Sequence, residues 1–382
     1  MSGHAAADRG GPDVSATAAG YHRGMAFDDE KLTKIVERFA HRHGGDGVHL
    51  ALEHVSSGER WVHGDPHAPL ILSSITKTYT AAVLVRLAVN GIVALTDPIG
   101  EFFDAATIRG IHLLRGEDSS ARVTVGQLLS HTSGIADYLH DRRNAGGTLR
   151  DDVFRQDRGW HLDEALDTVR RELRPHFAPG TPGRAVMSST DYLLAGRIIE
   201  TLTGRSWAEA VERHITEPLA LSNTWALGPD TLHRAGELPP LRDGERSLRI
   251  PQALASSQGH GALISTPADA IGFIRAFNDG RLLPRARVGA MQENWNRVVP
   301  PLRYGTGLMR YAIARALAPA HAPREFIGHA GGSGAFLFVC PGHDLVLAGT
   351  INRVRSRTLP FRLMARLAAA ASDPVAVPAP PR

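Results

Sequence analysis

The fold is decided by the stretch Leu72-Ser73-Ser74-Ile75-Thr76-Lys77-Thr78-Tyr79-Thr80-Ala81-Ala82. From Ser74 to about Val89 the chain is apolar around most of its circumference when drawn as a helix, which predicts a helix buried inside the molecule. Three-residue spacing puts the hydroxyl of Ser74 and the amine of Lys77 on one face of this helix, about one turn apart. We therefore expect the two side chains to meet.

This pair has the composition of an activated nucleophile. A serine hydroxyl is a weak nucleophile until a base takes its proton, and a buried lysine can lose its own proton and become that base, whereas arginine cannot. Of the 43 Lys and Arg residues only Lys31, Lys34 and Lys77 are lysines, so a lysine kept inside an apolar helix indicates chemistry rather than generic charge. The alternative is that Ser74 only caps the helix while Lys77 extends to solvent.

Working outward, helix and strand patterns lie on both sides of this stretch. We expect helices at about 28–41 and 359–371, and strands at 48–55, 60–63, 336–339 and 345–351. Strands near both ends of the chain predict one sheet built from both, with an inserted helical lobe. The predicted organisation is a disordered tail at 1–26, an α/β lobe from 27–90 and 255–372, a helical lobe at 91–254, and a disordered tail at 373–382.

Composition limits the other possibilities. The chain has 382 residues and a net charge of only +4, and its arginines are scattered, so we expect no nucleic-acid partner. It has no uninterrupted apolar run of about 18 residues, and Met1 to Phe27 has no continuous apolar stretch, which predicts a cytoplasmic protein without a membrane partner. The single cysteine, Cys340, lies in an apolar run and is expected on a buried strand.

The stretch around Ser74 resembles the nucleophile segment of class C β-lactamases, serine D-alanyl-D-alanine carboxypeptidases and related esterases. Three further segments, Leu128–Ile135, Tyr192–Glu200 and Ser265–Asp269, are similar to segments of the same superfamily in the same order. The resemblance covers about residues 28 to 372. It implies an α/β (α+β) fold of the β-lactamase/transpeptidase type, an antiparallel sheet flanked by helices with an inserted all-helical lobe.

A third motif is matched by His329-Ala330-Gly331-Gly332, which resembles the His-x-Gly variant of a strand that elsewhere has Lys-Thr-Gly. The resemblance implies that the backbone amides of Ser74 and Gly332 form an oxyanion hole. It also implies that His329 orients the substrate or assists proton transfer. Gly331 and Tyr304 are expected beside the substrate.

The second motif departs from the pattern, because Met187-Ser188-Ser189 stands where relatives have Tyr-x-Asn. In relatives the tyrosine shuttles protons with the lysine and the asparagine grips the acyl group; Met187 cannot do the first, and Ser189 does the second weakly. We expect both residues beside the substrate, and efficient hydrolysis is in doubt. Tyr138 and Tyr304 are both candidates to replace the tyrosine.

These observations predict a serine acyl-enzyme catalyst that moves an acyl group from an ester or activated amide of a small metabolite to an amine or alcohol, as in antibiotic or secondary-metabolite biosynthesis. One alternative is an esterase or β-lactamase-like hydrolase. Another is a noncatalytic ligand-binding relative, against which the retained Lys77 argues. No cofactor or metal is expected: His131, Asp137 and His140 lie close in sequence, but a structural role for them is favoured over a metal cluster.

Overall fold

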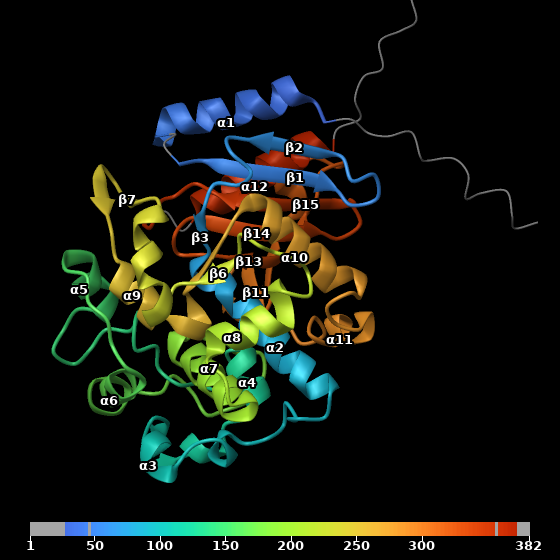
Figure 1. Cartoon of the computed structure of the whole chain (residues 1–382). Coiled ribbons are helices and arrows are strands. Elements are labelled where there is room, and N and C mark those ends of the chain that lie inside the picture. The colour runs from blue at the N-terminus through green and yellow to red at the C-terminus, as the bar shows by residue number, and fades with distance from the viewer. Residues whose placement is uncertain (1–26, 45–46, 356–357, 373–382) are drawn as a thin grey trace, which may run out of the picture.

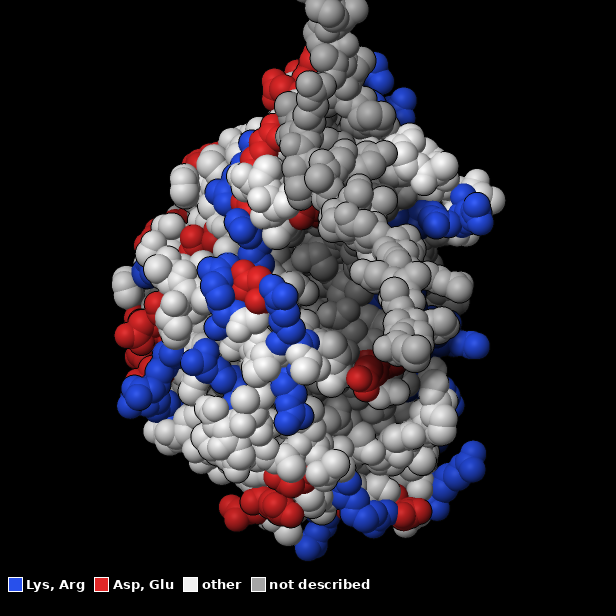
Figure 2. Space-filling model, turned by 90° about the vertical axis from the view of Figure 1, so that its right-hand side faces the viewer, with Lys and Arg blue, Asp and Glu red and all other residues white. Residues whose placement is uncertain are grey.

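The computed structural model describes residues 27–44, 47–355 and 358–372 (Figure 1). The tails predicted at 1–26 and 373–382 lie outside the described residues. Within the described ranges, no helix is both long and apolar enough to cross a bilayer. On the face drawn in Figure 2, Lys and Arg side chains lie interspersed with Asp and Glu.

An eight-stranded antiparallel sheet forms the centre of the described chain, in the order β10-β11-β12-β13-β14-β15-β1-β2. Its strands are β1 (His49–His54), β2 (Arg60–His63), β10 (Asn296–Val299), β11 (Leu302–Tyr304), β12 (Met309–Ala312), β13 (Glu325–Ala330), β14 (Ala335–Cys340) and β15 (Leu345–Thr350). The N-terminal hairpin therefore extends a sheet made by the C-terminal strands, with His49 opposite Thr350. This confirms the predicted fold class.

Both faces of the sheet are covered by helices, and side chains alternate between the two faces along each strand. Phe336 and Phe338 of β14 belong to the apolar cluster with α1 (Asp29–His43) and α12 (Leu359–Ala371). The intervening Leu337 belongs to the cluster with α2 (Thr76–Val89) and α10 (Pro267–Asp279). Because β15 is buried on both faces, it has no polar side chain from Leu345 to Gly349. Cys340 ends β14 and is buried, as predicted.

The helices at the end of the molecule opposite α1 are joined by loops (Figure 1). The α-helices outside the sheet layers are α3 (Ala105–Ile108), α4 (Val125–Leu129), α5 (Leu149–Arg155), α6 (Leu162–Glu172), α7 (Ser189–Thr203), α8 (Trp207–Val211), α9 (Pro251–Ser256) and α11 (Arg285–Ala290). Tighter or wider turns are η1 (Ser73–Ile75), η2 (Ile99–Glu101), η3 (Ser120–Arg122), η4 (Glu212–Thr216), η5 (Pro229–Glu237), η6 (Gln258–His260) and η7 (Arg315–Leu317). The limits predicted from the sequence for the α/β lobe and the helical lobe stay predictions.

Small sheets accompany these helices. Strand β9 (Leu263–Ser265) lies between β3 (Leu70–Ile71) and β6 (Trp225–Ala226). Two hairpins are formed by β4 (Leu113–Leu114) with β5 (Glu117–Asp118) and by β7 (Leu241–Asp243) with β8 (Arg246–Leu248). The pairing of β3 with β9 places the segment before Ser74 beside residues 263–265, far along the chain.

One prediction of local structure was inexact. The buried helix begins with the 3₁₀ turn η1, and α2 itself starts at Thr76, because Ser73 has a positive φ of 49° that turns the chain just before the helix. His329 lies in the C-terminal part of β13, which pairs with both β12 and β14, and the third motif comes just before the apolar run predicted at 336–339, which forms β14.

Candidate active site

Ser74 and Lys77 meet at the start of the buried helix. Ser74 lies in η1 and is half-buried, while Lys77 lies in the first turn of α2 and is only 2% exposed. The amine Nζ of Lys77 lies 3.1 Å from Oγ of Ser74, within hydrogen-bond distance. The structure thus brings together the two residues that the spacing predicts to meet, and Lys77 does not extend to solvent.

The surroundings of Lys77 make its amine a usable base. Burial lowers the pKa of Lys77 to about 8, although the carboxyl groups of Asp137 and Asp191 act to raise it. Nζ also donates to the backbone carbonyl of His260 at 3.1 Å and lies 5.8 Å from the ring centre of Tyr192. A substantial fraction of the lysine is therefore neutral in mildly alkaline solution and can accept the proton of Ser74.

Residues 259–263 pack along α2 and fix it by side-chain hydrogen bonds. Thr80 Oγ1 donates to the carbonyl of Gly259 at 2.7 Å, and the amide of Leu263 donates to Thr76 Oγ1 at 3.2 Å. Together with the bond from Lys77 to His260, these contacts join α2 to the segment over about one helical turn. Sequence reasoning missed His260, because its contribution to Lys77 comes from a backbone carbonyl, which leaves no pattern in the sequence.

The third motif lies against the nucleophile segment. A Cβ added to Gly331 would lie 2.3 Å from the carbonyl oxygen of Leu72, so only glycine fits this approach. Ser333 Oγ donates to the carbonyl of Ile71 at 2.5 Å, and a Cβ on Gly332 would lie 3.4 Å from Ser73 Oγ. The backbone of Gly331 and Gly332 is therefore next to the turn that carries Ser74, as an oxyanion hole from these two segments requires.

His329 is fully engaged by its neighbours. Its Nδ1 donates to the carbonyl of Ala330 at 2.9 Å, so its Nε2 accepts from the hydroxyl of Tyr304 at 3.0 Å. Burial and the nearby Lys77 lower the pKa of His329 to about 3, which keeps the ring neutral. Because the lone pair of Nε2 is occupied, this arrangement favours the orienting role of His329 over proton transfer.

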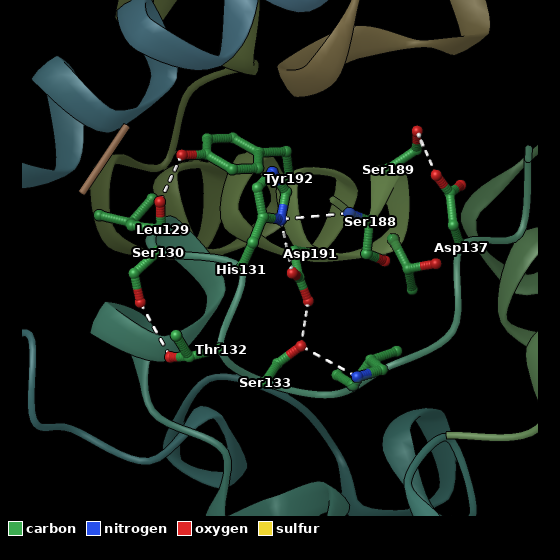
Figure 3. A network of polar contacts seen from close by, with 12 residues as sticks. Leu129, Ser130, His131, Thr132, Ser133, Asp137, Ser188, Ser189, Asp191 and Tyr192 are labelled. Carbon is green, nitrogen blue, oxygen red and sulfur yellow. Dashed lines mark hydrogen bonds and ion pairs between the residues drawn. The ribbon is translucent and has the colours of Figure 1, made fainter. Parts of the chain in front are cut away.

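The second motif opens α7 and faces Asp137 (Figure 3). Ser189 Oγ donates to Asp137 Oδ2 at 3.4 Å, a long bond, and Met187 is half-buried against the apolar cluster on the α1 side of the sheet. Burial opposes ionisation of Asp137, but His140 and the amide of Leu139 hold the pKa of Asp137 well below its usual range. A carboxylate anion thus lies near Lys77.

No tyrosine hydroxyl in the described ranges hydrogen-bonds to Ser74 Oγ or Lys77 Nζ. The hydroxyl of Tyr138 bonds to His260 Nε2 at 2.6 Å, and that of Tyr304 bonds to His329. Tyr192 donates its hydroxyl to the carbonyl of Leu129 at 2.7 Å (Figure 3). Both candidates for the missing tyrosine are therefore near the site, but each bonds to a histidine.

His131 belongs to a buried network under α7 (Figure 3). Its Nδ1 lies 2.8 Å from Asp191 Oδ2 and accepts from the amide of Ser188 at 3.2 Å, while Ser133 Oγ donates to Asp191 Oδ1 at 2.6 Å. Burial raises the pKa of Asp191 and lowers that of His131, so burial disfavours the charged form of each partner. Among the described residues, no group of three or more His, Cys, Asp or Glu side chains is placed to hold a metal ion.

Residues 15–371 match the family model described as Beta-lactamase. The chain belongs to the β-lactamase family. It is a serine-dependent enzyme of this superfamily, as the sequence predicts.

Named relatives agree with this membership. Penicillin-binding protein 4 of Amycolatopsis lactamdurans is 26% identical over 303 residues, which are 73% of this chain and 71% of that protein. Esterase EstB of Burkholderia gladioli is 28% identical over 200 residues, half of this chain and 47% of the esterase. The crystal structure of a D-stereospecific amidohydrolase from Streptomyces sp. superposes with a TM-score of 0.68 and 27% identity, over 86% of this chain and 95% of that one.

Two cavities lie away from the nucleophile. One of about 590 Å³ is lined by the end of α2, by residues 91–97 and by α11. Another of about 290 Å³ is lined by Trp160, Gln258 and neighbours. Ser74 lines neither, so the chemistry is located by the Ser74 and Lys77 pair and not by cavity size.

Proposed function

We propose that this β-lactamase-family enzyme is a transacylase: Ser74 takes the acyl group of an ester or activated amide of a small metabolite and passes it to an amine or alcohol. The observation that carries the proposal is the buried Lys77 amine at 3.1 Å from Ser74 Oγ, with no tyrosine hydroxyl bonded to either group within the described residues. The setting we propose is cytoplasmic secondary-metabolite or antibiotic biosynthesis, with no nucleic-acid or membrane partner.

In the acylation step, neutral Lys77 accepts the hydroxyl proton of Ser74 while Oγ forms a bond to the carbonyl carbon. The backbone amides of Ser74 and Gly332 stabilise the resulting oxyanion. The tetrahedral intermediate then collapses, the bond to the leaving group breaks, and Lys77 returns the proton to that group. The products are an ester on Ser74 and a free alcohol or amine.

In the transfer step, the acceptor attacks the same carbonyl carbon and loses its proton to Lys77, which passes it back to Ser74 Oγ as the acyl bond breaks. An amine acceptor brings its own nucleophilicity, whereas water needs a general base, an effect of roughly 10²- to 10⁴-fold. Loss of the second-motif tyrosine to Met187 therefore penalises hydrolysis more than transfer.

The test is to form the acyl-enzyme with an activated ester and to measure the ratio of amide to acid as a primary amine is added at constant pH. We expect the amide fraction to rise with amine concentration until it exceeds the acid. If no amide forms and hydrolysis is unchanged across the series, the transferase proposal fails.

A matched variant tests whether the loss of the tyrosine causes the expected preference for transfer. Met187→Tyr restores the residue that relatives carry at this position by resemblance, and we expect it to raise the share of acid in the products at the same amine concentration. An unchanged ratio of amide to acid would show that the loss of the tyrosine does not cause the preference for transfer. Ser188→Ala, next in sequence but bonded to Ala136 through its hydroxyl, serves as the neighbouring control.

The second candidate is a plain esterase or other hydrolase. It is favoured by the relatives named as an esterase and an amidohydrolase. A lysine with a pKa of about 8 is also able to activate water. The partition experiment distinguishes the two, because a hydrolase gives acid alone.

A further inference from the structure

The position of the Lys77 amine depends on a backbone carbonyl. Nζ has two hydrogen-bond partners in the described chain, Ser74 Oγ and the carbonyl of His260, each at 3.1 Å. A lysine stem has several rotatable bonds, so the amine stays near Ser74 only where another group holds it. In this chain that other group is the His260 carbonyl.

The side chain of His260 is anchored in the opposite direction. Its Nε2 lies 2.6 Å from the hydroxyl of Tyr138, and Nε1 of Trp160 lies 3.0 Å from the same hydroxyl. An indole N–H only donates, so the Tyr138 oxygen accepts a hydrogen bond from Trp160, and the Tyr138 hydroxyl donates a hydrogen bond to His260. Two sets of hydrogen bonds therefore meet at His260: Trp160 and Tyr138 hold its ring, and its backbone carbonyl holds Lys77, which bonds to Ser74. We call this set the hydrogen-bond chain, in which the covalent frame of His260 is the middle link.

The chain is buried and therefore well defined. Tyr138 is 0% exposed, His260 3% and Trp160 6%, and the rings of Tyr138 meet those of Trp160 and His260 edge to face. Burial lowers the pKa of His260 and raises that of Tyr138, so a neutral acceptor faces a protonated phenol. Breaking such a buried bond leaves a polar group without a hydrogen-bond partner, which is costly.

We propose that Tyr138 and Trp160 are positioning residues for acylation, which fix the His260 side chain and thereby the carbonyl that holds Lys77 Nζ against Ser74. This inference rests on the proposed function. Tyr138 acts through His260 and does not replace the missing tyrosine as a proton shuttle, because its hydroxyl is committed to His260 and Trp160. Lys77 keeps its place without a phenol partner because the carbonyl provides the second contact.

The test compares wild type with Tyr138→Phe, which keeps the ring and removes the hydroxyl. The measurement is the rate at which p-nitrophenyl acetate acylates Ser74, followed by intact mass from about pH 6 to about pH 10. We expect the alkaline plateau to fall about 10- to 100-fold, because a small misplacement of a catalytic group is costly. The midpoint of the rise moves to lower pH, because the ammonium form of Lys77 loses a fixed acceptor.

The titratable groups around Lys77 are Asp137, Asp191, His131, His260, His329 and Tyr192. Tyr138→Phe removes none of these groups, and among them only His260 loses a hydrogen-bond partner, so a shifted midpoint reports on how His260 holds Lys77. A variant that only loosens the fold lowers the yield of active protein and leaves the midpoint unchanged. An unchanged midpoint would therefore overturn the proposal even if labelling slowed.

Matched variants make the result specific. His260→Gln keeps an acceptor oxygen and should retain most of the rate, whereas His260→Leu should behave like Tyr138→Phe. The double variant Tyr138→Phe with His260→Leu should be no slower than either single one, since both break the same chain. Additive losses would contradict the proposal. Trp160→Phe removes one donor to the Tyr138 hydroxyl and should shift the rate and the midpoint in the same direction as Tyr138→Phe, but less. It replaces the His260 variants in the comparison if these do not fold.

Tyr311→Phe is the control, because it removes a half-buried hydroxyl from β12, where the ring packs on Phe361. It should leave rate and midpoint at the wild-type values. A wild-type protein that takes no label at any pH would overturn the proposed function and this inference together. Normal labelling of both wild type and Tyr138→Phe would overturn the positioning role alone.

Discussion

At the scale of single residues, the proposed mechanism makes the reactivity of Ser74 depend on the protonation state of Lys77. The amine is buried, lies within hydrogen-bond distance of Oγ, and has a pKa of about 8. The rate of acylation should therefore rise with pH through this value, because only the neutral amine accepts a proton. The spacing of Ser74 and Lys77 predicts their contact, since it depends only on local helix geometry.

Lys77→Arg should be nearly as damaging as Lys77→Ala. Arginine keeps the positive charge but cannot accept the Ser74 proton, so both variants lose general-base catalysis, roughly 10²- to 10⁴-fold. The measurement is the rate of Ser74 acylation by an activated ester. Substantial recovery with arginine would show that Lys77 is an electrostatic anchor.

Asp137→Asn should move the acid limb of the acylation profile to lower pH. Asp137 is held as an anion and acts to raise the pKa of Lys77, so removing the negative charge lowers that pKa. The pH dependence of the acylation rate in wild type and variant measures the shift. An unmoved or raised midpoint would mean that Asp137 does not act on Lys77 by its charge.

At the scale of elements, the site is assembled where β13 and its following glycines meet η1 and α2. The last helix was predicted at 359–371 and lies at those residues, because its apolar pattern is continuous. Strand β13 was not predicted, because Glu325, Gly328 and His329 interrupt its apolar pattern and its pairing with β12 and β14 defines it. The hydrogen bond between His329 and Tyr304 could not be predicted either, because it depends on how β11, β12 and β13 pair.

Gly331→Ala should impair both stability and acylation. The added methyl group would lie 2.3 Å from the Leu72 carbonyl, so the third motif must move away from the Ser74 turn, at a cost of about 1–3 kcal/mol. Thermal unfolding and the acylation rate check this. Gly289→Ala in α11 has open space at its Cβ and should change neither property for the worse. Wild-type behaviour of Gly331→Ala would contradict the close approach.

At the scale of the whole molecule, one sheet joins the two ends of the chain and brings distant segments to one point. Apolar strand runs near both ends predicted this sheet. The hydrogen bond from Lys77 to the His260 carbonyl could not be predicted, because the two residues are 183 positions apart. Every residue has a backbone carbonyl, so this contact leaves no pattern in the sequence. The sequence therefore predicts the contact between Ser74 and Lys77, while the tertiary fold provides the groups that hold it.

The central claim is that Ser74 is the nucleophile, and intact mass with peptide mapping tests it most directly. Wild type and Ser74→Ala are incubated with a panel of activated esters and β-lactams. We expect one acyl adduct on wild type, mapped to the peptide with Ser74, and none on Ser74→Ala, because no other hydroxyl in the chain has a lysine three residues later. Full labelling or full turnover by Ser74→Ala would contradict the account.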